Sequence, residues 1–140
     1  MLYLVPIGRF LYSAIFLMTV LGHFSAGYIG YAAQAGVPAP GLLVPLSGVI
    51  ATLGGLSITL GYKAKIGAWL IVLFLVPVTL KMHNFWAVTD PMMRGMQIAM
   101  FMKNVSMLGA ALLIACFGAG PLSLDARRSG QGAAAPATRA

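Results

Sequence analysis

Apolar residues along this chain gather into four long runs, which short stretches rich in polar residues, glycine or proline separate. The runs cover residues 7–24, 42–60, 66–85 and 96–117. A helix needs about 20 predominantly apolar residues to cross a hydrocarbon core roughly 30 Å thick, and each run is close to that length. The pattern therefore predicts an all-α integral membrane protein, a four-transmembrane-helix bundle that occupies residues 1–128 as a single domain.

Two segments lie outside this pattern. The stretch from Ser25 to Gly41 carries no charge, contains glycine and proline, and includes Tyr28 and Tyr31. Because tyrosine rings favour the level of the lipid headgroups, we expect a short interfacial segment that covers one end of the bundle like a lid. Residues 129–140 are small, polar and aperiodic, which predicts a disordered cytoplasmic tail.

The composition places the chain in lipid. Of its 140 residues 60% are hydrophobic and only 8% are charged, and the mean hydropathy is +0.92. These charges are too few to cover a soluble globule of this size. The net charge of +7 does not indicate a nucleic-acid partner, because the basic residues lie at the ends of the apolar runs and not along one face.

The basic residues instead predict the orientation. With four spans, both termini lie on the same side of the membrane. Six basic residues flank that side, Arg9, Lys63, Lys65, Arg127, Arg128 and Arg139, and three flank the other, Lys81, Arg94 and Lys103. The positive-inside rule then places both termini in the cytoplasm. We expect Arg9, inside the first run, to extend its side chain to the cytoplasmic headgroups.

Polar residues concentrate between Pro77 and Met107, where the last two runs meet at the outer face. The candidate ligand-binding residues are Lys103, Asn104, Lys81, His83, Asn84, Trp86 and, from the end of the first run, His23. If the fourth helix begins near Met96, Lys103 lies about 10 Å along its axis. A cation at that depth requires water, a partner or a path to the headgroups. The residues thus predict either an outward-facing cationic pocket or a lone lysine that extends past Met100 to the headgroups.

Common catalytic and metal-binding patterns are absent from the sequence. The acids Asp90 and Asp125 lie at opposite faces, which excludes a carboxylate pair, and no nucleophile triad, phosphate-binding glycine loop or dinucleotide motif occurs. Met92, Met96, Met100 and Met107 lie on nearly one helix face, but methionine is also an ordinary gap filler, so we expect no metal. We interpret Cys116, the single cysteine, as a small packed hydrophobe.

Several segments resemble the DoxX family of small bacterial membrane proteins. They are GRFLYSAIFLMTVLGHF, AAQAGVPAPGLLVPLSGVIATLGGLSITLGYKAKIGAWL, HNFW and FMKNVSMLGAALLIACFGAGPLSLDAR. The resemblance covers nearly the whole chain up to Arg127. It implies a multi-pass protein of the bacterial inner membrane, and in some members a subunit associated with a quinone-linked oxidoreductase.

Two positions depart from that family. This chain has His23 where the family often has a lysine, and Ala51 where it often has a glutamate. The two partners of a buried ion pair are thus missing together, which is coherent because either charge alone would be costly in lipid.

Two main functions remain open. The protein is either an accessory or assembly subunit that docks a partner membrane protein, or a subunit that binds a quinone or a small anion at the outer face. In the second case electrons would come from a partner, because the sequence shows no redox centre. A small transporter is a third reading, although a bundle of this size must oligomerise to line a wide pore. The sequence leaves open whether the protein is an enzyme.

Overall fold

The computed structural model describes residues 2–130, all of whose regular structure is helical. The first span is α1 (Leu4–Met18), continued by the 3₁₀ helix η1 (Val20–Phe24), and the short helix α2 (Ala26–Gln34) follows it. The other spans are α3 (Pro40–Leu60), α4 (Ala64–Met82) with the 3₁₀ helix η2 (Phe85–Ala87), and α5 (Pro91–Phe117). A final short helix, α6, covers Leu124–Arg128.

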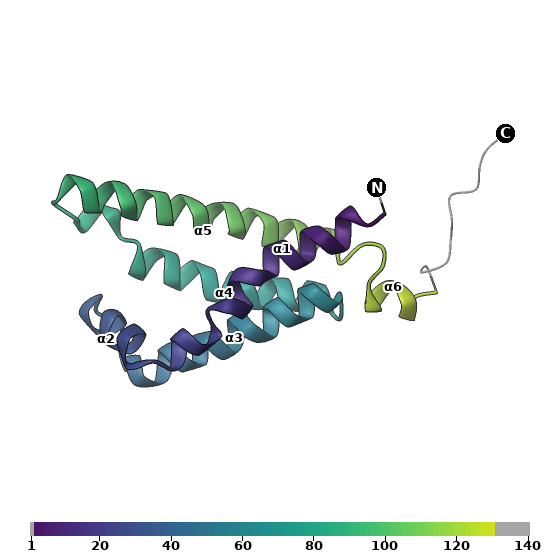
Figure 1. The fold of residues 1–140 in the computed structure, drawn as a ribbon, viewed down its shortest axis with the longest axis horizontal. Coiled ribbons are helices and arrows are strands. Elements are labelled where there is room, and N and C mark those ends of the chain that lie inside the picture. Colours follow the sequence, from purple (N-terminus) through teal and green to yellow (C-terminus); the bar gives the residue numbers. More distant parts are fainter. Residues whose placement is uncertain (1, 131–140) are drawn as a thin grey trace.

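Four of these segments are long and apolar enough to cross a membrane, namely Leu4–Phe24, Pro40–Leu60, Ala64–Ala87 and Pro91–Phe117. The predicted all-α architecture with four spans is confirmed. In Figure 1 the spans run along one common direction, with α2 and η2 at one end and α6 with the start of α1 at the other. We call these the α2 end and the α6 end. Residues 131–140, most of the tail predicted to be disordered, lie outside the described residues.

The fourth span begins five residues earlier than the apolar run indicates. Asp90 is the N-cap residue, and its carboxylate accepts a hydrogen bond from the Met93 backbone N–H at 2.8 Å. Pro91 occupies the first turn, where its missing N–H costs little. Because Arg94, Gly95 and Gln97 dilute the apolar pattern, hydrophobicity alone places the start of α5 too late.

Helix α3 is the centre of the bundle, and glycines set its spacing to its neighbours. A β-carbon on Gly54 would collide with the Gly67 carbonyl oxygen and with Ile71, both on α4. On the side toward α1, Gly55 lies against Phe16 and Leu17. Small residues allow such close approach between helix backbones in lipid. The buried core is built around these contacts from Phe16, Ala51, Ile58, Ala68, Ile71, Leu75 and Ala111.

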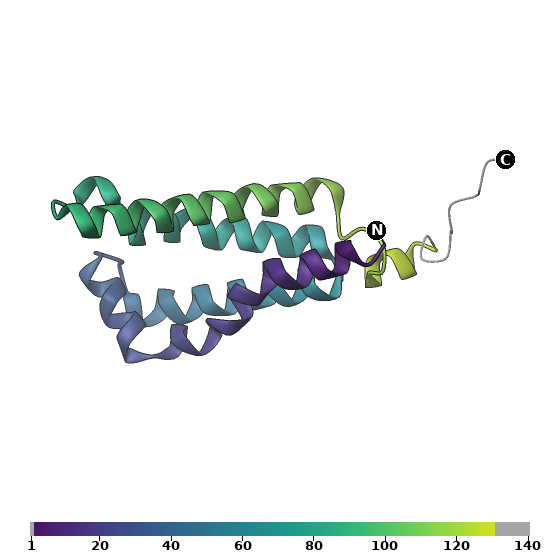
Figure 2. The same cartoon turned by 45° about the horizontal axis from the view of Figure 1, so that its top comes forward.

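Helix α1 follows α3 closely but is joined to α5 through few contacts. Figure 2 shows α1 lying beside α3, with α4 and α5 forming the other side of the bundle. The Tyr12 hydroxyl bridges the two sides, because it donates to the Met107 carbonyl at 2.9 Å. Cys116 is exposed on α5, so the prediction that it is a packed hydrophobe is wrong.

A clasp of polar groups closes the α6 end. Arg9 is 6% exposed, and its guanidinium donates to the Ala119 carbonyl at 2.8 Å and to the Leu122 carbonyl at 2.7 Å. The Asp125 carboxylate accepts the backbone N–H groups of Lys63 and Ala64, at 2.8 and 3.0 Å. The expectation that Arg9 extends to the headgroups is wrong, because two carbonyls of the irregular segment after α5 accept hydrogen bonds from its guanidinium inside the protein, although its Nε has no partner among the described residues.

Replacing Arg9 by methionine should therefore destabilise the protein. Two charge-assisted hydrogen bonds are lost and two carbonyls are left without their donor, for which we expect a decrease of about 3 kcal/mol in the free energy of unfolding. Unfolding by sodium dodecyl sulfate in mixed micelles measures this quantity. The control Arg94→Gln removes an exposed cation at the other end and should change stability by less than about 0.5 kcal/mol. Equal stability of the two variants would contradict the clasp.

Candidate functional site

The seven candidate ligand-binding residues come from four elements. Lys81 lies in the last turn of α4, and His83 is the residue that caps this helix. Asn84 precedes η2 and Trp86 lies within it. Lys103 and Asn104 belong to α5, and His23 belongs to η1. The turn between α4 and α5 thus holds three of the seven candidates, His83, Asn84 and Trp86, and the other four lie on neighbouring helices.

A chain of hydrogen bonds joins His83 to α2. His83 Nδ1 lies 2.8 Å from the side-chain oxygen of Gln97, and the Gln97 amide nitrogen donates to the Tyr31 hydroxyl at 3.3 Å. Because an amide oxygen can only accept, His83 Nδ1 carries the proton in this arrangement. The chain ties the turn after α4, the start of α5 and the lid-like α2 together.

Aromatic rings stand beside this chain. The ring centroids of Phe85 and Trp86 are 5.2 Å apart, and Phe101 of α5 lies 5.3 Å from Phe85 and 6.1 Å from Trp86. All three pairs are edge-to-face, the geometry that the ring quadrupoles favour. Trp86 remains 57% exposed. The cluster fixes η2 against α5 and leaves the indole of Trp86 exposed, three residues after His83.

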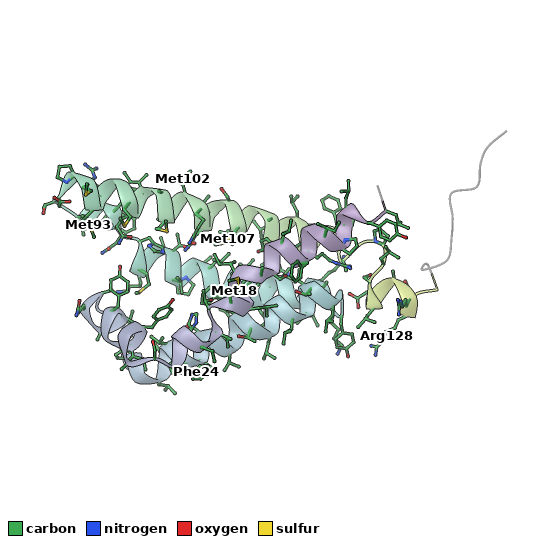
Figure 3. The ribbon with its side chains drawn as sticks, viewed as in Figure 1. Met18, Phe24, Met93, Met102, Met107 and Arg128 are labelled. Carbon is green, nitrogen blue, oxygen red and sulfur yellow. The ribbon has the colours of Figure 1, made fainter. Side chains whose placement is uncertain are left out.

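Lys103 and Asn104 are neighbours in sequence but lie in different surroundings. Lys103 is exposed on α5, and its ammonium lies 3.7 Å from the Met100 sulfur. Asn104 is 4% exposed. Successive residues of a helix point about 100° apart, which places one side chain on the lipid-facing surface and the other between helices. Met102, one residue before Lys103, also projects from the outer side of α5 (Figure 3).

His23 is a buried histidine with contacts of its own. It is 8% exposed, its Nδ1 donates to the Thr19 carbonyl at 2.9 Å, and its ring lies against Phe74 and Tyr28 at 5.8 and 5.7 Å. Gly48 of α3 leaves the space that the imidazole fills. These contacts are sufficient to hold the ring. Whether His23 shares a ligand with the other six candidates stays a prediction.

The sequence interpretation overlooked Gln97 and Tyr31, which join His83 to α2. One signal could have found Gln97: it is an uncharged polar residue among methionines, close to the start of a membrane helix. No comparable signal marks Tyr31, since an interfacial tyrosine is common. Lys81 and Asn84 remain solvent-facing or half-buried, so the structure joins only part of the candidate set directly. Among residues 2–130 no group of three or more His, Cys, Asp or Glu side chains could hold a metal ion.

Comparison with known proteins gives two matches. The sequence profile of the SURF4 family matches residues 44–130, which contain most of α3 and all of α4 through α6. The inner membrane protein YphA of Escherichia coli (strain K12) is 33% identical over 101 residues, which are 72% of this chain and 71% of that protein. A search of the solved structures gave no match.

The hydrogen-bond chain predicts that Gln97 stabilises α2. In Gln97→Leu, and equally in Tyr31→Phe, we expect backbone amides of residues 26–34 to exchange about fivefold faster with deuterium, the effect of one lost hydrogen bond of about 1 kcal/mol. Hydrogen exchange followed by mass spectrometry measures this rate. The double variant should be no faster than either single one, because both remove the same link. The control is Tyr28→Phe, which keeps the ring against His23.

If Tyr28→Phe accelerates exchange as much as Tyr31→Phe, the hydroxyl of Tyr31 has no special role. If the two losses add, Gln97 and Tyr31 stabilise α2 through separate contacts.

Proposed function

The chain belongs to the SURF4 family, and we propose that it acts as an accessory or assembly subunit of a membrane complex. Four helices long and apolar enough to cross a bilayer, together with its similarity to an inner membrane protein of Escherichia coli, make it a multi-pass protein of the inner membrane. Most of its large exposed apolar side chains lie along these helices, where they contact lipid.

The exposed position of Lys103 supports this function most directly. Lys103 lies twelve residues beyond Pro91, the first residue of α5, which corresponds to about 18 Å along the axis at roughly 1.5 Å per residue. Among residues 2–130, only the Met100 sulfur, a weak acceptor, contacts its ammonium. A lysine near the bilayer centre costs about 3 kcal/mol, and less toward the interface. A partner that supplies a carboxylate would remove this cost.

The acids of this chain are engaged elsewhere. Asp90 caps α5 and Asp125 caps the start of α4. A counter-ion for Lys103 would therefore come from outside the chain. Small exposed residues on α5, Gly95, Ala99 and Gly109, leave room for a second helix to approach the surface around Lys103. Together these features favour a partner membrane protein with an acidic residue inside its span.

We propose further that the partner belongs to an oxidoreductase system, as the resemblance to the DoxX family implies. The HNFW motif at the α2 end and the Lys103–Asn104 pair near the middle of α5 carry that resemblance. A second candidate function is binding of a quinone or a small anion at the α2 end. The exposed indole of Trp86 favours it, because its N–H can donate to a quinone oxygen and its ring can stack on the quinone head.

Replacing Lys103 tests whether this lysine takes part in docking or ligand binding or serves only the fold. We expect Lys103→Met to lower recovery of the partner about tenfold or more, because a desolvated charge pair is lost, while the protein still inserts and folds. Affinity purification from native membranes in mild detergent, with quantitative mass spectrometry and quinone extraction, measures both outcomes. The matched control is Arg94→Met on the same helix, which should recover the partner normally.

Unchanged recovery of every co-purifying protein in Lys103→Met would reject the docking role. Loss of quinone with retention of the partner would instead favour the second candidate. Lys81→Met should have a weaker effect than Lys103→Met in either case, because Lys81 lies in the last turn of α4 near the headgroups.

We also propose that both termini are cytoplasmic. Lys63, Lys65, Arg127 and Arg128 lie at the α6 end, and Lys81 and Arg94 lie at the α2 end. In a Cys116→Ala background, a cysteine at Ser129 should react with an impermeant maleimide only after the membrane is opened. A cysteine at Ala87 should react in intact spheroplasts. The reverse labelling would invert the orientation and place Lys103 nearer the cytoplasmic face.

A further inference from the structure

A groove at the α6 end lies where α4 begins and α5 ends. Its volume is about 730 Å³. Lys63, Lys65 and Ile66 line it on one side, and Phe117 with residues 118–121 lines it on the other. Asp125 and Ser129 close it toward α6. The groove is separate from the residues at the α2 end, and no function proposed above uses it.

The part of the groove around Lys63 and Lys65 is basic. The lysines at positions 63 and 65 are both exposed, on either side of the buried Ala64. The Asp125 carboxylate also lines the groove, but its two oxygens accept backbone N–H groups of Lys63 and Ala64. The Lys65 stem passes over Gly118 at the end of α5. Both lysines therefore line the groove, with the Lys63 ammonium 5.8 Å from the centre of the Tyr62 ring, while the acid that lines it is held by the backbone.

Further positive charge lies close by. The guanidinium of Arg128, labelled at this end in Figure 3, lies 4.6 Å from the centre of the Tyr62 ring. A cation held over an aromatic ring keeps its position without a carboxylate. Arg127 adds another charge on α6. The potential at the mouth of the groove is therefore positive, even with Asp125 counted.

The part of the groove around Ile66 and Phe117 is apolar and open to lipid. Phe117 is 82% exposed and Ile66 is 58% exposed. Trp69, one helical turn beyond Lys65 on the same side of α4, is also 58% exposed. Tryptophan at this depth is typical of the membrane interface. The apolar wall thus continues from Lys63 and Lys65 along the outside of α4 and α5.

The geometry points to a binding site for one anionic phospholipid. The phosphate lies between the ammonium groups of Lys63 and Lys65, and an acyl chain lies along Ile66 and Phe117. Basic pockets at the ends of membrane helices bind anionic headgroups in this manner. A free inorganic phosphate would use the lysines but would gain nothing from the exposed phenyl ring and indole.

The test counts lipids bound to the purified full-length protein. Native mass spectrometry follows titration with phosphatidylglycerol, and with phosphatidylcholine of the same acyl chains. We expect one phosphatidylglycerol to bind with clear preference. Lys65→Gln should weaken it about fivefold, and Lys63→Asn by a similar factor, since each cation near a headgroup contributes about that much. Asparagine suits position 63, where the backbone φ is 48°.

Three variants control for general surface charge, for the fold and for contact with the acyl chain of the lipid. Arg94→Gln removes one cation at the α2 end and should leave binding unchanged. Lys65→Arg preserves the charge and should retain binding, which separates loss of the site from loss of the fold. Phe117→Ala should weaken long-chain phosphatidylglycerol while leaving a dihexanoyl analogue unaffected.

Several results would overturn the proposal. Equal binding of phosphatidylcholine, or equal weakening by Arg94→Gln and Lys65→Gln, would show that only general surface charge attracts lipid. Displacement of the bound lipid by inorganic phosphate at equal concentration would show a site for a free anion. Binding unaffected by the Lys63→Asn/Lys65→Gln double variant would place the lipid elsewhere.

Discussion

Direct contact between helix backbones around α3 is the constraint on which the remaining structure depends. In lipid, an apolar side chain gains little by leaving the acyl chains for another helix, so association relies on close packing and internal hydrogen bonds. Gly54 brings α3 against the Gly67 carbonyl of α4, and Gly55 brings it against α1. Gly48 leaves the space for His23. A larger residue at these positions would separate the helices and move the α2 end.

The scarcity of acids gives the two ends of the bundle their character. Asp90 and Asp125 both accept backbone N–H groups at helix starts. Both carboxylates therefore serve the fold, and the lysines at either end lack a carboxylate within the described chain. A positive surface results at both membrane faces. The two proposed binding roles, docking of a partner at Lys103 and binding of a lipid at Lys63 and Lys65, differ in chemistry. Lys103 lies within a span, while Lys63 and Lys65 lie at the headgroups.

Hydropathy predicted the four spans because lipid imposes one length and one polarity on every helix that crosses it. It failed at the start of α5, where the capping residues Asp90 and Pro91 outweigh a dilute apolar pattern. It failed also for Arg9, whose acceptors belong to carbonyls more than a hundred residues away in an irregular segment. His83 was identified as a candidate, but its link through Gln97 to Tyr31 depends on how α2 folds back, which no local period encodes.

The clasp at Arg9 has a consequence for biosynthesis. Its acceptors, the Ala119 and Leu122 carbonyls, follow it by 110 and 113 residues. At translation rates of about 5–20 residues per second, Arg9 is made roughly 5–20 s before those carbonyls exist. Throughout that interval the guanidinium lacks its two carbonyl acceptors, so water, headgroups or the insertion machinery must solvate it. Completion of the bundle is thus coupled to the arrival of its last segment, and a chain released early retains an unsatisfied charge that distinguishes it from the finished protein.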